Sequence, residues 1–402
     1  MDLSEFLSMV SSDAALRRRR RLQPAGGKGD KIFPATYPGS APGAPRHVFE
    51  RRRDHGTDVW CCLVDSVQSQ ANRLEESLLS AIRSGDVAIP HVLVDFKPHR
   101  LDQIAEITSL DAPHRIYDAI MRDSLLDGTP FMESTVGRAL TAASQRNAST
   151  LLEVSPTALV FGAWHSTGAG GGLGAKFARC LVSEIIAVNV PVDENPRSGE
   201  VQTAGRRTGS RIDPLGVLKR VEVYKGESGW ALTADDAGKD AKKVRPSEIN
   251  HGNIAPSVQP LGITCDWLEH TVVISFAALR RLSFGSDERN KLARAYLGAL
   301  GLLAVTEQDV RGYALRSRCD LVPEQDDAFE CVHADGTTTP LEFDPPTVRD
   351  LYKEAYETAK ALGFRLREEP LRLTPQAKLV EIIRRSQELA LEGRGGDDPG
   401  QG

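Results

Sequence analysis

A glycine-rich stretch between two apolar runs, residues 156–190, constrains the fold more than any other part of the sequence. An apolar run of strand length leads to His165, and five glycines fall within residues 166–174. A short helical pattern then carries Lys176 and Arg179 one turn apart, and a β-branched run follows. The pattern predicts a strand, a glycine turn, a helix and a strand. Free backbone N–H groups at such a turn favour a phosphate or nucleic-acid backbone, although a tight turn beside solvated cations explains the same residues.

The glycine run fits nucleotide-binding motifs poorly. A P-loop requires Gly-Lys-Ser/Thr, whereas here alanine separates the last glycine from Lys176. The frame Gly170, Gly172, Ala175 satisfies G-x-G-x-x-A, with Asp193 near the distance expected for a ribose-binding acid. However, Asp193 lies beyond the next predicted strand, and no succession of βαβ units surrounds the motif. A nucleotide-dependent enzyme is therefore the weakest reading.

Composition indicates an ordinary globular protein of the cytoplasm. Fifty Lys and Arg against 55 Asp and Glu give a net charge of −5, so any nucleic-acid surface must come from local clustering. The six cysteines form no C-x-x-C pair, which is typical of reduced thiols. No apolar run is long enough to span a membrane. The acidic amphipathic start precedes the first cations, the reverse of a secretory signal.

A second strand is predicted at residues 60–64, followed at once by an amphipathic helix. Asp65 is the expected N-cap, with Gln68 at the capping-box position. The first turns of this helix are rich in amides and hydroxyls where Glu and Lys would suffice for solubility. We interpret them as a hydrogen-bonding surface, with a solvated helix face as the alternative.

Composition divides the chain into five segments. Residues 1–31 predict a helix and a basic connector, whose five arginines at 17–21 are either a solvated tail or an arm that contacts nucleic acid. Residues 32–190 predict the first part of a mixed core, including a helix from residue 135 to 145 capped by Ser134. Residues 191–260 read as a long insertion with strands at 221–224 and 230–233. Residues 261–392 complete the core, and residues 393–402 predict a disordered tail.

Within residues 261–392 the pattern predicts a strand ending near Phe276 and a helix capped by Ser286 that stops at Gly301. A hairpin follows at 329–343, then a helix starting at Pro345 and a last helix starting at Thr374-Pro375.

No catalytic or metal-binding motif stands out, and we predict no cofactor. The nine histidines show neither H-x-x-x-H nor H-E-x-x-H spacing. His165 precedes Ser166, but adjacent residues on a strand point to opposite faces. A hydrogen bond to RNA or to the neighbouring loop is the more natural role for His165. The balance of polar chemistry without catalytic partners points to binding and not to an enzyme.

Several runs together resemble one family, the type I-U (also called I-G) CRISPR-associated RAMP backbone subunits, which are Cas-seven-type proteins of the Csb-one family. The resembling runs are residues 63–76, 115–124, 161–168, 171–179, 183–185, 253–257 and 277–282. The Asp-Ser-Val-Gln-Ser-Gln-Ala-Asn-Arg run at 65–73 and the Trp-His-Ser-Thr-Gly run at 164–168 are the most specific. The resemblance extends from about residue 32 to about residue 364.

The resemblance implies an α+β fold, a modified RRM-like (ferredoxin-like) palm with inserted finger and thumb elements and C-terminal helices. Copies would polymerise in a helical filament along a CRISPR RNA, within a Cascade-like complex of antiviral defence. The partners implied are the CRISPR RNA, the target DNA strand of the R-loop, further copies, a large subunit and an end-capping or processing RAMP subunit. Base pairing would supply sequence specificity, and the subunit itself would not be a nuclease.

Motif position and donor chemistry together give a set of RNA-contact hypotheses: Gln68, Gln70, Asn72, Arg73, Arg138, His165, Ser166, Thr167, Gly171, Gly172, Lys176, Arg179, Arg206, Arg207 and Asn253. The competing reading is a RAMP-type endoribonuclease that processes precursor CRISPR RNA, with His165 or His251 as base.

Overall fold

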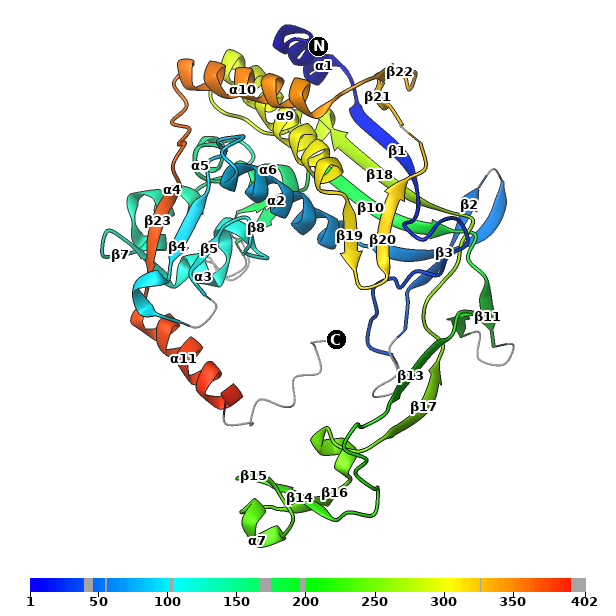
Figure 1. Ribbon diagram of the computed structural model, residues 1–402. Coiled ribbons are helices and arrows are strands. Elements are labelled where there is room, and N and C mark those ends of the chain that lie inside the picture. Colours follow the sequence, from blue (N-terminus) through cyan, green and yellow to red (C-terminus); the bar gives the residue numbers. More distant parts are fainter. Residues whose placement is uncertain are drawn as a thin grey trace. The chain divides into compact units, whose positions relative to one another are not determined.

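Figure 1 shows the computed structural model of the protein, which describes residues 1–39, 46–54, 56–101, 104–165, 175–195, 200–325 and 327–391. The fold is mixed α/β. The chain divides into two compact units. Unit 1 contains residues 1–190 and 264–380, and unit 2 contains residues 191–263 and 381–402. The predicted tail, 393–402, lies outside the described residues.

The core of unit 1 is an antiparallel sheet. Within the described residues it has nine strands, with the order β19-β20-β1-β18-β10-β3-β2; β21 also pairs with β1, and β22 pairs with β21. The strands are β1 (Ala15–Pro24), β2 (Phe49–Asp54), β3 (Thr57–Asp65), β10 (Leu181–Val188), β18 (Trp267–Ser275), β19 (Tyr313–Arg316), β20 (Cys319–Pro323), β21 (Phe329–Val332) and β22 (Thr338–Leu341). The predicted strands at 60–64 and 183–190, the strand near 276 and the hairpin at 329–343 are confirmed.

The arginine run is strand β1, so its prediction as a connector or free arm is wrong. Because side chains alternate along a strand, Arg18 and Arg20 are buried on one face of the sheet, 1% and 7% exposed. The Asp309 carboxylate forms ion pairs with both guanidinium groups, at 2.9 Å from Arg18 Nη2 and 3.0 Å from Arg20 Nη1. The odd-numbered arginines lie on the other face, where Arg19 pairs with Glu269 at 2.6 Å. A run of like charges is tolerated in a central strand because these charges have partners.

Helices cover one face of the sheet: α1 (Leu3–Ser12), α2 (Val67–Arg83), α9 (Asp287–Arg311) and α10 (Pro345–Ala361). The predicted Ser286 cap of α9 is confirmed, but the helix does not stop at Gly301. A Cβ at Gly301 would lie 3.4 Å from the side chains of Ile274 and Leu181. Gly301 thus allows close helix–sheet packing, and α9 ends instead at Gly312, whose φ is 81°.

A second, smaller sheet lies in unit 1, with the order β5-β4-β23-β6-β7. Its strands are β4 (Val92–Asp95), β5 (Glu106–Thr108), β6 (Ser124–Leu126), β7 (Thr129–Pro130) and β23 (Leu371–Pro375). The predicted helix start at Thr374-Pro375 is therefore wrong, because these residues end β23 and α11 runs over Ala377–Leu391.

Unit 1 also contains short helices: η1 (Lys97–His99), η2 (Arg115–Tyr117), α3 (Ala119–Arg122), η3 (Phe131–Glu133), α4 (Thr135–Thr141), α5 (Ser149–Val154), α6 (Thr157–Phe161) and α8 (Phe276–Arg280). The Ser134 cap of α4 is confirmed, since its hydroxyl accepts from the Gly137 N–H at 3.0 Å. The predicted strand before His165 is wrong: it is mainly helix α6. Every residue of α6 is buried, and a short segment that is apolar on all sides has no period to reveal its type.

Unit 2 is built from small antiparallel sheets. These are β11 (Val192–Glu194) with β12 (Val201–Thr203), β13 (Arg207–Arg211) with β17 (Ile254–Gln259), and β14 (Val223–Gly226) between β15 (Gly229–Ala231) and β16 (Lys242–Val244). Helices α7 (Ala234–Ala237) and η4 (Pro246–Ile249) complete it. The predicted strands near 221–224 and 230–233 correspond to β14 and β15.

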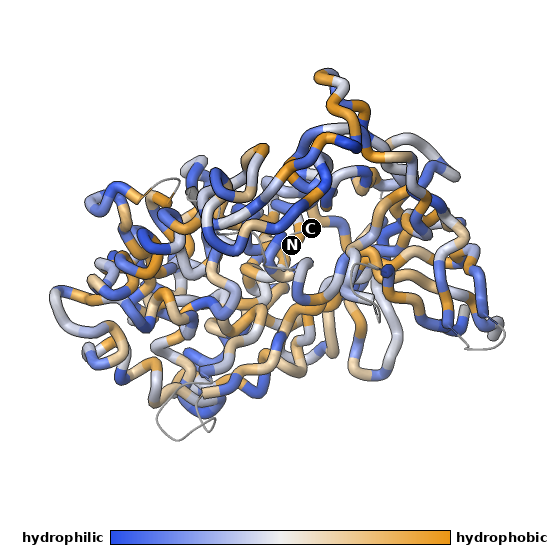
Figure 2. Tube along the Cα trace, turned by 90° about the horizontal axis from the view of Figure 1, so that it is seen from below, coloured by the Kyte–Doolittle hydropathy of each residue, from blue (hydrophilic) through white to orange (hydrophobic). Residues whose placement is uncertain are grey.

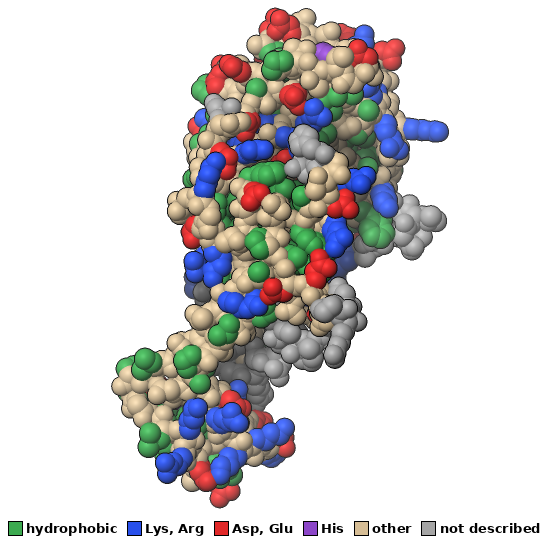
Figure 3. Space-filling view, turned by 90° about the vertical axis from the view of Figure 1, so that its right-hand side faces the viewer, with side chains coloured by type: hydrophobic (Ala, Val, Ile, Leu, Met, Phe, Trp, Pro, Cys, Tyr) green, Lys and Arg blue, Asp and Glu red, His purple; other side chains and the backbone are tan. Residues whose placement is uncertain are grey.

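The surface of unit 2 combines cations with exposed apolar side chains. Figure 3 shows Lys and Arg gathered around hydrophobic side chains on the lobe that contains β14–β16 and α7. The exposed large apolar residues of this unit include Ile212, Leu215, Leu218, Trp230, Leu232 and Val258, each more than half exposed.

Apolar and polar residues are interspersed along the coloured parts of the trace (Figure 2). Among the described helices, none combines the length and the apolar character needed to cross a membrane.

Candidate nucleic-acid interface

Strands β8 (Ala163–Trp164) and β9 (Lys176–Phe177) form a small antiparallel pair that presents an aromatic ring beside a cation. Trp164 is directly opposite Lys176, and the Lys176 Nζ lies 5.5 Å from the centroid of the indole ring. The Trp164 side chain is 51% exposed. An exposed aromatic ring with an adjacent ammonium group offers a stacking surface for a base and a charge for its phosphate.

His165 lies beneath this surface. It is only 5% exposed, and its ring stacks on Tyr117 at 4.8 Å between centroids with an interplanar angle of 7°. The His165 N–H donates to the Ala175 carbonyl at 2.9 Å, which extends the pairing of β8 and β9 by one residue at the loop end. Burial, together with the nearby Arg122 cation, lowers the pKa of His165, so the ring is neutral at neutral pH. His165 therefore supports the hairpin from below.

The Nδ1 atom of His165 is buried without a hydrogen-bond partner in the part of the chain that the structure describes. No described Asp or Glu hydrogen-bonds to its ring, so no orienting carboxylate is in place for a general base. His251, the other histidine considered as a base, belongs to unit 2 and contacts Trp230 edge-on at 5.7 Å.

Two guanidinium groups lie close to the hairpin. Arg115 forms a bidentate pair with Glu75, 2.7 Å for each contact, and donates from Nη1 to the Gly162 carbonyl at 3.0 Å. The Arg179 Nε donates to the Phe161 carbonyl at 3.1 Å. Burial and repulsion from Arg115 lower the pKa of Arg179. Two arginines thus share one carboxylate, which leaves the base of the hairpin electropositive.

The predicted helix after the glycine run is wrong. Lys176 lies in strand β9 and Arg179 follows it in a loop, so the two are not one helical turn apart. Among the described residues 156–165 and 175–190, no helix begins after the glycine run to bind phosphate with its N-terminus. Four of the predicted contacts, Ser166, Thr167, Gly171 and Gly172, lie outside the described residues.

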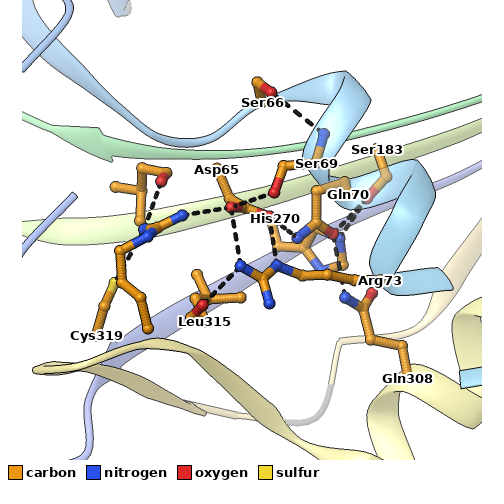
Figure 4. A network of polar contacts seen from close by, with 12 residues as sticks. Asp65, Ser66, Ser69, Gln70, Arg73, Ser183, His270, Gln308, Leu315 and Cys319 are labelled. Atoms are coloured by element: carbon orange, nitrogen blue, oxygen red, sulfur yellow. Dashed lines mark hydrogen bonds and ion pairs between the residues drawn. The ribbon is translucent and has the colours of Figure 1, made fainter. Parts of the chain in front are cut away.

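Much of the predicted polar surface at the start of α2 is a hydrogen-bonded network around the buried Asp65 (Figure 4). Ser66, and not Asp65, is the N-cap, and its hydroxyl accepts from the Ser69 N–H at 3.3 Å. Asp65 is wholly buried and accepts from Gln70 Nε2 at 2.7 Å, from Arg73 Nε at 2.9 Å and from Arg316 Nη2 at 2.6 Å. A structural role therefore replaces the predicted RNA contact of the buried Gln70, whereas Arg73 is partly exposed and its RNA contact stays a prediction.

The network continues from Gln70 to side chains of the central sheet. Ser183 lies between Gln70 Oε1, at 3.0 Å, and His270 Nε2, at 2.7 Å (Figure 4). Tyr313 links His270 Nδ1 at 3.3 Å to Asp309 at 2.6 Å. A chain of side chains from five elements, α2, β10, β18, β19 and α9, is thus hydrogen-bonded inside unit 1, which fixes the register of the sheet against its helices.

The remaining predicted contacts are exposed. Gln68 and Asn72 lie on the outer side of α2, and Arg138 lies on α4 with its guanidinium donating to the Glu133 carbonyl. In unit 2, Arg206 pairs with Asp193 at 2.7 Å, and Asn253 accepts from the Asp213 N–H at 2.7 Å. Arg207 begins β13 and is exposed. The predicted set thus divides between the two units.

The residues predicted to contact RNA include neither Trp164 nor Tyr117, the support of His165. One signal was present for Trp164: it alternates with His165 along an extended segment, so a buried His165 places Trp164 on the outside. No local signal reveals Tyr117, which lies 48 residues away from His165 in sequence.

Comparison with known proteins adds the following. Residues 16–192, somewhat less than half of the chain, match the sequence model of a family described as CRISPR-associated protein GSU0053. The matched segment includes α2, β8, β9 and β10. The crystal structure of Thermofilum pendens Csc2 aligns with 98% of this chain and 84% of its own, at 10% identity and a TM-score of 0.26. That similarity is too low to support an argument. No curated protein sequence matches the chain.

Proposed function

We propose that the chain, whose residues 16–192 match the sequence model of the CRISPR-associated family described as GSU0053, belongs to that family and is an RNA-binding backbone subunit of a type I effector complex. In this role several copies polymerise along a CRISPR RNA in the cytoplasm and present the guide for pairing with target DNA. The subunit is not catalytic. Its partners are the CRISPR RNA, the target DNA strand, neighbouring copies and the other subunits of a Cascade-like complex.

The β8–β9 hairpin is the observation that carries this proposal. It lies inside the matched segment, and it offers an exposed indole, an exposed ammonium group and an electropositive base. Stacking on an aromatic ring and attraction to phosphate both tolerate any base sequence. A subunit that holds a guide of variable sequence needs this kind of contact, because pairing with the target carries the specificity.

The two units have different tasks in this proposal. Unit 1 corresponds to the palm, of modified ferredoxin-like type, and holds the RNA backbone through the hairpin. Unit 2 corresponds to the thumb. Its exposed Trp230 and Leu232, next to the cations of β14 and β16, suit a surface that contacts a neighbouring copy and the RNA it carries.

Co-expression with a matching CRISPR array tests the proposal. We expect the purified chain to retain RNA of defined length and to form particles of several copies, measured by size exclusion with light scattering. Trp164→Ala combined with Lys176→Ala should reduce RNA retention. Lys360→Ala is the matched control, because Lys360 is a cation on α10 that pairs with Glu368 at 2.7 Å, away from the hairpin elements.

Two results would overturn the proposal. A chain that stays monomeric and free of RNA beside its array does not form a guide filament. RNA shortened at defined positions by the wild-type chain, but left intact by His165→Ala or His251→Ala, would replace the backbone role with that of an endoribonuclease.

A further inference from the structure

Three side chains with different metal-binding atoms converge in unit 1, at residues that do not belong to the β8–β9 hairpin. They are Asp13, which follows α1, Cys331 in β21 and His333 just after β21. Their ligand atoms all lie within 4.8 Å of one another. Asp13 is more than 300 residues away from the other two in sequence, so this cluster exists only in the folded chain.

The distances are close to those of a shared metal ion. His333 Nδ1 lies 2.8 Å from Asp13 Oδ1 and 3.9 Å from Cys331 Sγ. Tetrahedral zinc with its usual bond lengths separates such atoms by about 3.4 to 3.6 Å. Shifts of about half an ångström therefore suffice to place an ion among them, in exchange for the hydrogen bond between Asp13 and His333.

The second ring nitrogen of His333 is also held. His333 Nε2 lies 2.8 Å from the Thr339 hydroxyl in β22. This contact fixes the plane of the ring and leaves Nδ1 directed at Asp13 and Cys331. A histidine that ligates through one nitrogen commonly has the other hydrogen-bonded in this way, because the second contact orients the ring.

The backbone that carries the three ligands is fixed without a metal. Cys331 is paired with Leu16 in the β1–β21 ladder. The Ala14 N–H, next to Asp13, donates to the Val332 carbonyl at 2.8 Å, and the His333 N–H donates to the Thr337 carbonyl at 2.9 Å. Preorganised ligands lose little conformational entropy when an ion binds.

We propose that Asp13, Cys331 and His333 form a zinc-binding site. Thiolate and imidazole together favour Zn²⁺ over the hard cations Mg²⁺ and Ca²⁺. One thiolate and one carboxylate balance the charge of the ion, and a water molecule or a group from a partner completes the tetrahedron. On binding, the thiol proton of Cys331 leaves to solvent and a zinc–sulfur bond forms without any change of oxidation state.

The site would join two parts of the fold that are far apart in sequence. Zinc at this point ties the end of α1 and the start of β1 to the β21–β22 hairpin. Cys331 is 3% exposed, while the His333 side chain is 35% exposed, so the ion has a route from solvent. Because the ion binds only the folded chain, it stabilises that state by mass action.

Metal analysis of the full-length chain tests this proposal. The chain is purified without a histidine tag, stripped with a chelator and titrated with Zn²⁺ against a chromophoric competitor. We expect one equivalent of zinc, a rise in the thermal midpoint with zinc, and loss of both in Cys331→Ser and His333→Gln. Thr339→Val should bind about 10- to 100-fold more weakly, since only the orienting contact is removed.

Cysteine chemistry supplies the control. Cys265→Ser removes a half-buried thiol outside the cluster and should keep the full equivalent. With Co²⁺ in place of zinc, a thiolate-to-metal charge-transfer band should appear in the wild type and in Cys265→Ser but not in Cys331→Ser. No zinc in the wild type, or unchanged zinc in both Cys331→Ser and His333→Gln, would overturn the site and leave an Asp13–His333 ion pair in its place.

Discussion

The Arg115 guanidinium donates from Nε and Nη2 to the two carboxylate oxygens of Glu75, and both distances are 2.7 Å. The side chains are 7% and 1% exposed. Burial raises the pKa of Glu75 to about 7, although Arg115 opposes the shift. The third contact of Arg115, with the Gly162 carbonyl, connects this pair on α2 and η2 to the residue before β8.

Breaking this pair should be costly. Arg115→Ala leaves the Glu75 carboxylate buried without its cation, and we expect a loss of about 3 to 5 kcal/mol in the free energy of unfolding. Urea titration measures the loss. Arg311→Ala is the control. Arg311 pairs with Glu76, which follows Glu75 in sequence, and the two side chains of this pair are 41% and 60% exposed. That variant should lose less than about 1 kcal/mol; equal losses in the two variants would contradict the assignment.

Acid should destabilise unit 1 through His270. Burial, with the Arg18 cation nearby, lowers the pKa of His270 to about 3. The unfolded chain takes up this proton near pH 6.5 and the folded chain does not, so stability is lost as the pH falls from about 6.5 towards 3. The contribution is at most about 1.4 kcal/mol per pH unit. Denaturation at several pH values should give a shallower acid slope for His270→Gln; an unchanged slope would show that His270 is not the group responsible.

RNA affinity should depend on the β8–β9 hairpin. Trp164→Ala removes the stacking surface and should weaken binding of single-stranded RNA about 5- to 150-fold, from 1 to 3 kcal/mol per stacked base. Lys176→Ala should reduce the slope of log affinity against log salt by about 0.7. Filter binding at several salt concentrations measures both effects. If Lys176→Ala leaves the salt slope at the wild-type value, Lys176 does not contact phosphate.

Two neighbouring polar residues of α2 should behave in opposite ways. Gln70→Ala removes one buried hydrogen bond from Asp65 and one from Ser183, and it should destabilise the chain by about 1 to 3 kcal/mol. Asn72→Ala, on the exposed side, should change stability by less than about 0.5 kcal/mol. Thermal unfolding of the two variants checks this contrast. RNA affinity lost by the Gln70→Ala chain while its stability is unchanged would restore Gln70 as a contact.

The exposed apolar residues of unit 2 should act in assembly. Trp230→Ser with Leu232→Ser removes two side chains that are 52% and 65% exposed. Little stability should be lost, but fewer copies should assemble per RNA, as mass photometry of the co-expressed complex would reveal. Leu389 on α11 is 47% exposed, and Leu389→Ser serves as the matched surface control. Complexes of wild-type size from the double variant would exclude this surface from assembly.

Local patterns were sufficient where one face of an element is buried. The Ser134, Ser286 and Asp344 caps, the amphipathic helices α2 and α10 and the β21–β22 hairpin follow from residues close together in sequence. Local sequence patterns gave wrong predictions where an element is buried on all sides. Helix α6 is apolar on every side, and Gly301 reads as a stop although the sheet requires a small residue there.

The sequence by itself determined that this chain is mixed α/β, where most of its strands and helices lie, and that polar, cation-rich stretches point to nucleic acid. Only the tertiary structure decided what those polar residues do. The sequence suggests that Arg18 and Gln70 are surface donors. In the structure both are buried and donate hydrogen bonds to carboxylates, Arg18 to Asp309 and Gln70 to Asp65. Trp164, which ends an apolar run in the sequence, is exposed beside Lys176. The physical reason is that hydrogen bonding and burial depend on residues brought together from distant parts of the chain. The sequence around a residue does not identify these distant partners.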